Sequence, residues 1–156
     1  MVKEIGRAEK KSYIKGALDL SREKAEAAID AYKRGNYGQV LSSLYYSYFH
    51  IIKSLLYEKG FDPKSHEGVY AMLNLHFIKP GALDKKVSRL FEKLHKNREI
   101  VDYNPLAPKF DRSDADQFLH EFMELTPSIL TSLHNYKSAR DNIIHLLKEL
   151  TALKNL

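Results

Sequence analysis

Apolar side chains recur at intervals of three and four residues along most of the chain, which is the spacing that places them on one face of an α-helix. The first such stretch runs from Ile14 to Tyr32, and Gly35 follows it as a candidate cap. A second stretch follows at once, from Tyr37 to Leu56, and Gly60 closes it. This second stretch is so apolar that we expect its helix to be buried.

The remaining chain repeats the pattern in shorter pieces. Asp62 before Pro63 predicts the N-cap of a short helix that reaches about Phe77. A longer helix is predicted over 84–103 and another from Ser113, where Asp116 completes a near capping box. We expect Pro127 to interrupt or kink that helix. A last amphipathic segment reaches the C-terminus. Because the pattern is helical nearly everywhere and no segment shows strand alternation, the sequence predicts an all-α bundle.

The length of 156 residues predicts a single domain, 1–156, with a core of about 14–134 and an additional C-terminal helix at about 137–155. The chain has no cysteine, which excludes disulfides and thiolate chemistry and suits a reducing compartment. Its charged N-terminus and the lack of a long apolar run predict a cytoplasmic protein without a membrane span. The net charge of +5 is compatible with nucleic-acid binding and equally with an ordinary helical surface.

One charged side chain stands out, because Arg98 falls four residues after Leu94 and three before Val101 and so lies on the apolar stripe. Asp102 follows one helical turn later and can pair with it. If the pair is exposed it is unremarkable, whereas a buried pair needs a partner or a function. Two further polar groups are candidates. His66 is expected in the first turn of the short helix, pointing inward, where a histidine is more often a hydrogen-bonded core residue. Tyr46 falls off the main stripe of the second helix and can line a groove or a subunit contact.

The usual templates for enzymes are absent. A carboxylate-bridged di-iron bundle needs two Glu-x-x-His pairs, and the chain has one, Glu92 with His95. It contains no glycine-rich phosphate loop, no Gly-x-Ser-x-Gly and no His-Glu-x-x-His. We therefore expect no metal site and no cofactor.

Three short motifs, in order over about seventy residues, resemble the HEPN domain family: YYSYF in the second helix, KSH after the turn, and R-x-x-x-D-Y at Arg98, Asp102 and Tyr103. The resemblance implies an up-and-down bundle of four to five helices that forms a homodimer, with the arginine-bearing helices meeting at a groove. It also implies a partner, because family members are often paired with a small nucleotidyltransferase as toxin and antitoxin. By the same logic Tyr103 is a candidate for nucleotide modification.

Many members of that family resemble ribonucleases in which an R-x4-6-H motif acts on the scissile phosphate. Here no histidine follows Arg98 after four to six intervening residues, since those positions are Tyr103, Asn104 and Pro105. Proton transfer near neutral pH suits imidazole, whereas tyrosine has a pKa of about 10. Asp102 would be a poor base and is better suited to holding the arginine.

Two other Arg–His pairs fit the spacing. Arg89 with His95 lies earlier in the same helix, and Arg140 with His145 lies in the C-terminal helix, away from the position that the resemblance gives to the motif. Such pairs arise easily by chance, so the second is only a weak catalytic candidate.

The leading hypothesis is an HEPN-type protein that binds RNA, a nucleotide or a partner protein through Arg98, Asp102, Tyr103, His66 and Tyr46 without being an efficient nuclease. The alternative is a metal-independent ribonuclease toxin with a composite active site at the dimer interface, using Arg98 and Asp102 or the Arg140–His145 pair. A third interpretation is a purely structural bundle, in which replacing Arg98 changes no binding.

Overall fold

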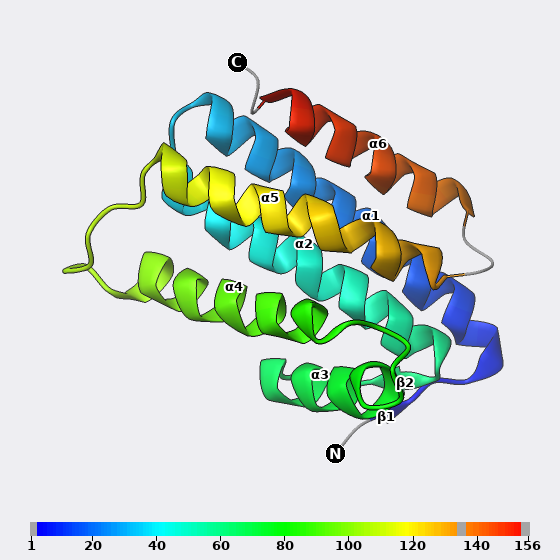
Figure 1. Ribbon diagram of the computed structural model, residues 1–156. Coiled ribbons are helices and arrows are strands. Elements are labelled where there is room, and N and C mark those ends of the chain that lie inside the picture. Colours follow the sequence, from blue (N-terminus) through cyan, green and yellow to red (C-terminus); the bar gives the residue numbers. More distant parts are fainter. Residues whose placement is uncertain (1–2, 134–136, 154–156) are drawn as a thin grey trace.

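The computed structural model (Figure 1) describes residues 3–133 and 137–153. Its elements in chain order are β1 (Lys3–Glu4), α1 (Arg7–Lys33), α2 (Tyr37–Glu58), β2 (Phe61–Asp62), α3 (His66–Leu73), the π-helical turn η1 (Asn74–Ile78), α4 (Lys85–Tyr103), α5 (Arg112–Thr131) and α6 (Lys137–Leu153). The predicted all-α bundle is confirmed. The two strands are too short to show an alternating pattern, and they pair antiparallel through Lys3 with Asp62 and Glu4 with Phe61.

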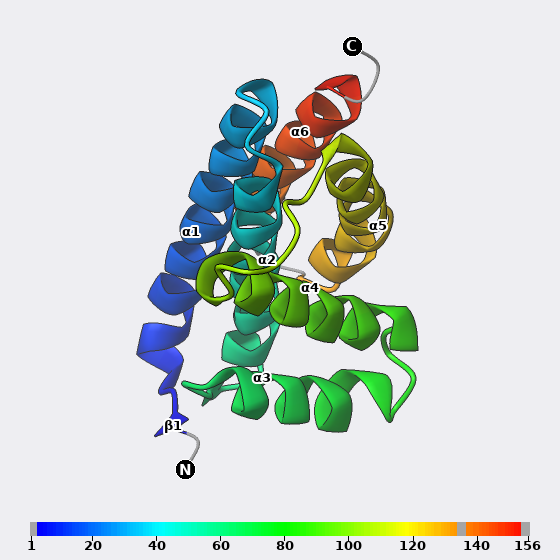
Figure 2. The same ribbon diagram turned by 90° about the vertical axis from the view of Figure 1, so that its left-hand side faces the viewer.

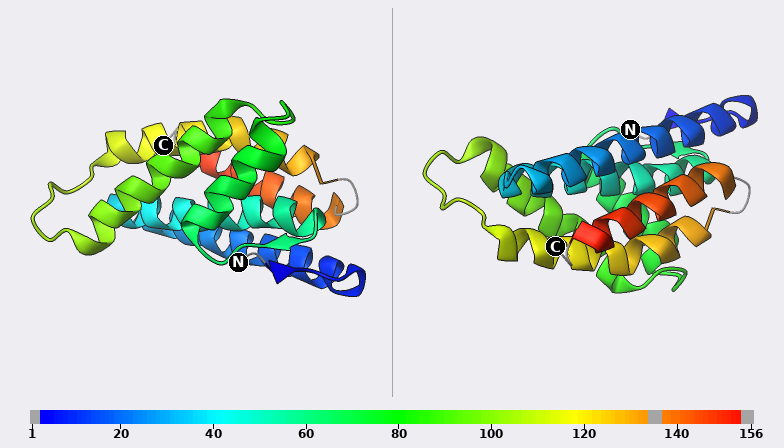
Figure 3. Two further views of the ribbon diagram at one scale, coloured as in Figure 1. Left: turned by 90° about the horizontal axis from the view of Figure 1, so that it is seen from below. Right: turned by 90° about the horizontal axis from the view of Figure 1, so that it is seen from above.

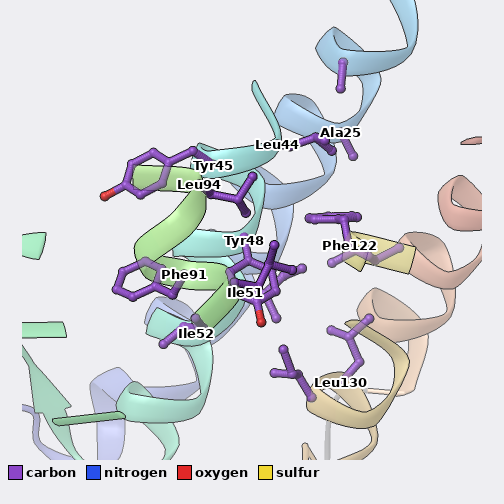
Figure 4. Close-up of a cluster of buried hydrophobic side chains, with 14 of the residues drawn as sticks. Ala25, Leu44, Tyr45, Tyr48, Ile51, Ile52, Phe91, Leu94, Phe122 and Leu130 are labelled. Carbon is purple, nitrogen blue, oxygen red and sulfur yellow. The ribbon is translucent and has the colours of Figure 1, made fainter. Parts of the chain in front are cut away.

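The centre of the bundle is α2, which packs against α1, α4 and α5. Its apolar stripe is buried almost throughout, as its composition predicted. Figure 4 shows side chains from α2, α4 and α5 meeting in one cluster, among them Tyr48, Phe91 and Phe122. Each large apolar side chain that leaves water in this way contributes about 1.5–3 kcal/mol, so this cluster is a principal source of stability for the fold.

The seam between α1 and α2 is closed by two serines. The Ser21 hydroxyl donates to the Ser47 carbonyl at 2.9 Å, and the Ser47 hydroxyl donates to the Ser21 carbonyl at 2.9 Å. Both side chains are fully buried, so the bonds satisfy hydroxyls that would otherwise be costly in the core. Small side chains at both positions allow the two helices to lie close together.

The other helices cover the two sides of this pair. In Figure 2, α3 and α4 lie across the direction of α1 and α2, and α5 lies on the opposite side of α2 from α1. Figure 3 shows α6 between α1 and α5, and it packs against both. Three apolar residues attach it to them, with Ile143, Leu146 and Leu147 all buried.

Helix boundaries follow local chemistry, although two predicted N-caps were wrong. The turns at Gly35 and Gly60 have φ of 73° and 93°, a conformation that glycine adopts at little cost. The N-cap of α3 is Ser65 rather than Asp62, since the Ser65 hydroxyl accepts from the Gly68 amide at 3.0 Å. For α5, the capping box consists of Asp111 and Asp114, so that the helix begins before Ser113.

Asp62, the last residue of β2, does not cap a helix, and its carboxylate is buried. Lys53 donates to Oδ1 of Asp62 at 2.7 Å, and Lys64 donates to Oδ2 at 2.6 Å. The Lys53 ammonium also donates to the carbonyl of Pro63 at 2.7 Å. The carboxylate therefore ties the segment after α2 to α2 itself.

Pro127 lies within α5, which continues through it to Thr131. The predicted interruption of the helix is therefore absent. A proline in a helix interior costs about 3 kcal/mol, and buried residues on both sides of it, among them Phe122, Ile129 and Leu130, offset that cost.

Candidate functional site

Arg98 lies on the inner face of α4, and its side chain is 13% exposed. Its Nη2 donates to the Tyr46 hydroxyl at 2.5 Å, and its Nη1 donates to Oε1 of Glu99 at 3.0 Å. Its Nε lies 3.4 Å from Oδ2 of Asp102, as the spacing of one helical turn predicted. This Nε is within ion-pair distance of the carboxylate but forms no hydrogen bond. The guanidinium is thus held from two sides while part of its donor capacity stays unused.

Three tyrosine rings surround the same guanidinium. Its Cζ lies 5.1 Å from the ring centre of Tyr46 and 5.5 Å from those of Tyr45 and Tyr103. Burial has the largest single effect and lowers the pKa of Arg98, but the hydrogen bond to Tyr46 together with the charges of Tyr46, Tyr103 and Asp102 outweighs burial and leaves the pKa raised. The side chain therefore remains charged at every relevant pH. Tyr103 is the outermost of the three, with 67% of its surface exposed.

Asp102 connects the site to α2, because its Oδ2 accepts a hydrogen bond from the Ser42 hydroxyl at 3.3 Å. Ser42 is buried, so this contact fixes the carboxylate against the bundle. A carboxylate fixed in this way holds the arginine from the Nε side, while Nη1 and Nη2 contact Glu99 and Tyr46.

His66 joins the site from α3. Its Nδ1 lies 2.9 Å from the Tyr45 hydroxyl, and its Nε2 lies 2.5 Å from Oε1 of Glu92. Burial raises the pKa of Tyr45, so the hydroxyl keeps its proton and can donate a hydrogen bond to Nδ1 of the neutral His66 ring. In the neutral ring this arrangement places the imidazole hydrogen on Nε2, facing Glu92. Figure 4 shows the Tyr45 oxygen pointing away from the apolar cluster.

His95 is the residue that the sequence analysis did not place in the site. Its ring stacks on that of His66, with 3.6 Å between the centres and 17° between the planes. Its Nε2 lies 3.7 Å from Oε1 of Glu99, the same oxygen that accepts from Arg98. Its position three residues before Arg98 puts both on one helical face, and that spacing was the available signal.

The environment of His95 favours the neutral ring. Its Nδ1 is buried and has no hydrogen-bond partner among the described residues. Burial first, and then the neighbouring His66, lower the pKa of His95 below its ordinary value. An imidazole that is neutral near pH 7 can accept a proton.

Arg140 and His145, the weak catalytic candidates on α6, have separate partners. Arg140 donates to the carbonyl of Leu133 at 3.0 Å, at the end of α5. His145 is 74% exposed and lies 3.3 Å from Glu149. No contact joins Arg140 to His145 in the described part of the chain. Arg89 is exposed and lines a cavity of about 380 Å³ between α4 and α5. The histidine that the spacing paired with it, His95, belongs instead to the Arg98 cluster, by which we mean Arg98 and the side chains described above around it: Tyr45, Tyr46, His66, Glu92, His95, Glu99, Asp102 and Tyr103.

A second cavity, of about 520 Å³, adjoins the C-terminal end of α4 beside Asp102 and Tyr103 in the sequence. Its lining includes Arg34, Asn104 and Lys109, with no acidic residue. Within 3–133 and 137–153, no group of three or more histidine, cysteine or acidic side chains is arranged to hold a metal ion. None of the helices in the same ranges has the length and apolar character needed to cross a membrane.

Comparison of the sequence with known proteins identifies the family of the chain. The model of the HEPN domain matches residues 17–129. The chain is 31% identical over 135 residues to "Putative toxin MJ0142" of Methanocaldococcus jannaschii, covering 82% of this chain and 91% of that protein. It is 28% identical over 108 residues to "Putative toxin MJ0605" of the same organism, covering 69% and 79%.

A third relative is a "UPF0332 protein" of Thermotoga maritima, 24% identical over 99 residues, covering 64% of this chain and 74% of that protein. The match to the family model extends from α1 to the end of α5, and so includes every helix that contributes to the Arg98 cluster. The chain therefore belongs to the HEPN domain family and is similar to proteins named as toxins.

Proposed function

We propose that the chain binds single-stranded RNA or a nucleotide at Arg98, with a phosphate on the guanidinium and a base against Tyr103. It would do so as a homodimer and as the companion of a small nucleotidyltransferase in a toxin–antitoxin-like pair. The observation that carries the proposal is a largely buried guanidinium, with donors to spare, beside an exposed tyrosine ring.

The guanidinium is suited to phosphate because its five N–H groups form a rigid fork that matches two oxygens of the anion. Its two hydrogen bonds, to Tyr46 and Glu99, leave further N–H groups for a ligand. Both Tyr46 and Asp102 fix the fork from the protein side, so little conformational freedom is lost on binding.

Glu99 is the group that a phosphate would replace. Its side chain is 47% exposed, and an exposed ion pair contributes only about 0–1 kcal/mol. A phosphate can therefore take its place on Arg98 at little cost. Asp102, which is held by Ser42, would stay.

Tyr103 provides the second half of the site. A base stacked on an aromatic side chain contributes about 1–3 kcal/mol, with little preference for sequence. Its ring centre lies 5.5 Å from the guanidinium carbon, so one ligand can contact both side chains. The arrangement favours a single strand over a duplex, whose bases are not free to stack.

The test is fluorescence anisotropy with a labelled single-stranded RNA. We expect Arg98→Ala to weaken binding at least tenfold, and Arg98→Lys to recover only part of it because lysine lacks the fork. Tyr103→Ala should weaken binding about 5- to 100-fold while Tyr103→Phe keeps it. Arg22→Ala, which removes an exposed arginine paired with Glu26 on α1, is the control.

Equal losses in Arg22→Ala and Arg98→Ala would contradict the proposal, because they would indicate binding by overall charge. The salt dependence is an independent measure. Each phosphate contact on a single strand adds about −0.7 to the slope of log K against log salt concentration. One or two contacts at Arg98 therefore predict a slope near −1.

The partnership is tested by co-expression of this chain with a small nucleotidyltransferase, followed by purification through a tag on one protein. The names of the relatives as toxins support a paired system. Recovery of the untagged protein in stoichiometric amount is the expected result. Two separate proteins at micromolar concentration would contradict it.

Ribonuclease activity is the second candidate function, and one observation favours it. The imidazole that the sequence motif lacks is present in space, because His95 and Arg98 lie on either side of one Glu99 oxygen. Incubation with single-stranded RNA in EDTA, comparing wild type with Arg98→Ala and His145→Ala, tests for metal-independent cleavage and for the α6 pair. Cleavage that disappears in His145→Ala alone would assign the activity to α6.

A further inference from the structure

The Tyr46 ring contacts a second cation besides Arg98, and that cation comes from α1. The ammonium of Lys24 lies 5.6 Å from the ring centre, and the guanidinium carbon of Arg98 lies 5.1 Å from the same centre. We propose that Lys24 is a second phosphate-binding residue, so that a single strand of RNA places one phosphate on Arg98 and another on Lys24. This inference rests on the proposed binding function and decides between its two ligands in favour of the strand.

Lys24 is partly buried, and its charge has no acidic partner. Within 3–133 and 137–153 its ammonium forms no ion pair and no hydrogen bond, whereas Arg22 on the same helix is paired with Glu26. A cation over the face of an aromatic ring is attracted to it. The Tyr46 ring therefore holds the ammonium in place and leaves its charge uncompensated.

His50 indicates that the electrostatic potential beside Lys24 is positive. It follows Tyr46 by one turn of α2, so the two side chains share a helical face. Burial first, and then the charges of Lys53 and Lys24, lower the pKa of His50 to about 4. Lys53 is paired with Asp62, whereas Lys24 is not paired. The surface next to Tyr46 is therefore one that stabilises an anion.

The order of the contacts makes Arg98 and Lys24 two subsites rather than one. The phosphate proposed on Arg98 replaces Glu99 at Nη1, while Nη2 donates to the Tyr46 hydroxyl. Lys24 lies against the ring of that tyrosine. The first phosphate and Lys24 thus contact the pair of Arg98 and Tyr46 at different ends. A mononucleotide fills one subsite, whereas a ligand with two phosphates fills both.

The two subsites are close enough to act on one ligand. Both cations lie within 5.6 Å of one ring centre, and charges are screened only over about 10 Å at 0.1 M salt. In Figure 2, α1 and α2 run side by side and α4 lies across them. The strand would pass from Tyr103 and Arg98 on α4 over Tyr46 to Lys24 on α1. Such a path combines a stacked base with two phosphate contacts, as surfaces that bind single strands do.

The experiment compares ligands with one and two phosphates by competition against a labelled single-stranded RNA. The competitors are uridine 5′-monophosphate and the 5′-phosphorylated dinucleotide pUpU. We expect Lys24→Ala to weaken pUpU about 3- to 5-fold, the upper range for one partly exposed ion pair. Binding of uridine monophosphate should be unchanged in that variant, because its phosphate lies on Arg98. Arg98→Ala should weaken both ligands.

The salt dependence of RNA binding is a second measurement. Loss of one phosphate contact makes the slope of log K against log salt concentration less steep by about 0.7. Lys24→Ala should show this change, and Lys24→Arg should not. Lys15→Ala is the matched control, because Lys15 is an exposed lysine on the opposite face of α1, nine residues earlier. Lys24→Gln removes the charge but keeps most of the stem, and circular dichroism establishes that each variant is folded.

An NMR titration of His50 reports the potential at the second subsite without relying on affinity. Lys53 and Lys24 are the charged groups that lower the pKa of this histidine. In Lys24→Gln the pKa of His50 should therefore be higher than in wild type. Saturating pUpU should also raise it in wild type, because a phosphate compensates Lys24, whereas uridine monophosphate should leave it unchanged.

The outcomes separate this inference from the proposed binding function. Binding that is lost in Arg98→Ala but unchanged in Lys24→Ala and Lys24→Gln would overturn the second subsite and leave the Arg98 site in place. Equal effects of Lys15→Ala and Lys24→Ala would also overturn it, since they would reflect overall charge. A wild-type protein that binds no RNA would overturn both. Loss of pUpU alone in Lys24→Gln, with loss of both ligands in Arg98→Ala, supports both.

Discussion

Two cationic side chains in the described part of the chain are largely buried, Lys53 and Arg98, and they differ in how completely their charge is satisfied. Lys53, 6% exposed, donates to Asp62 and to the Pro63 carbonyl, and both contacts are 2.7 Å long. Arg98 retains unused donors and faces a displaceable carboxylate. The charge of the lysine is thus satisfied within the protein, whereas Arg98 is the side chain that we propose to bind a ligand. Geometry, rather than burial alone, distinguishes a structural charge from a candidate functional one.

The buried carboxylate of Asp62 makes stability depend on pH. Burial raises its pKa, but the hydrogen bonds from Lys53 and Lys64 outweigh burial and hold the pKa below 3.8. Because the folded pKa is depressed, this contribution is present above the unfolded pKa of about 3.9 and is lost as pH falls through the folded value. We predict that Asp62→Asn destabilises the protein by about 3–5 kcal/mol at pH 7.

Urea denaturation between pH 7 and pH 3 measures this effect, with a smaller difference between Asp62→Asn and wild type at the acid end. Glu26→Gln is the control, because the Arg22–Glu26 pair is exposed on α1. Equal losses of stability in the two variants would show that burial of the Asp62 carboxylate has no special importance.

At the scale of elements, the site depends on the shortest α-helix of the bundle. α3 has eight residues, fewer than an isolated helix needs to be stable in water, so packing and capping must hold it. Its first residue is His66, which reaches α2 through Tyr45 and α4 through Glu92. The position of one short helix therefore decides whether the two histidines stack.

We predict that Ser65→Ala, which removes the N-cap of α3, lowers stability by about 1 kcal/mol. Ser65→Asp should keep it, since aspartate is an equally good cap. The ring resonances of His66 and His95 in NMR spectra should shift together in the alanine variant, because the stack loosens. Ser128→Ala, which removes an exposed hydroxyl on α5, should leave those resonances unchanged.

The apolar pattern predicted the helices well, because residues three and four apart lie on the same face of a helix and that face is the one buried in the bundle. It also placed Arg98 on an inner face, since a residue between Leu94 and Val101 at helical spacing can hardly lie elsewhere. The caps were harder. Asp62 looked like an N-cap locally, but Lys53 is nine residues away in sequence and binds it only after β2 has folded back on α2.

The histidine stack was beyond sequence reasoning for a similar reason. His66 and His95 are separated by a break at Gly81 and lie on different helices, so their contact depends on how α3 packs against α4. Of the two histidines, only His95 could be placed near Arg98 from the local sequence, because it lies three residues before Arg98 on the same helix. The functional roles of these residues remain predictions.

At the scale of the whole molecule, α6 lies outside the part of the chain that matches the family model, yet it covers α1 and α5. Its contribution is apolar, through Ile143, Leu146 and Leu147. We predict that a chain ending at Leu133 is less stable by roughly 5 kcal/mol, at about 1.5–3 kcal/mol for each buried side chain. Urea denaturation measures this loss, and RNA binding by the folded fraction should persist, because the Arg98 cluster lies on α2, α3 and α4.

A triple substitution of the three apolar residues of α6 by serine is the companion measurement. It keeps the chain length and should reproduce most of the loss. Unchanged stability in both variants would mean that α6 does not support the bundle.

The reciprocal bonds between Ser21 and Ser47 have a consequence for how this family varies. Each hydroxyl reaches the other helix's backbone only because neither side chain keeps the two helices apart. A larger residue at one position would push the helices apart unless the other became smaller. Among homologues, the two sites should therefore change in concert, with a glycine or alanine opposite any residue bulkier than serine.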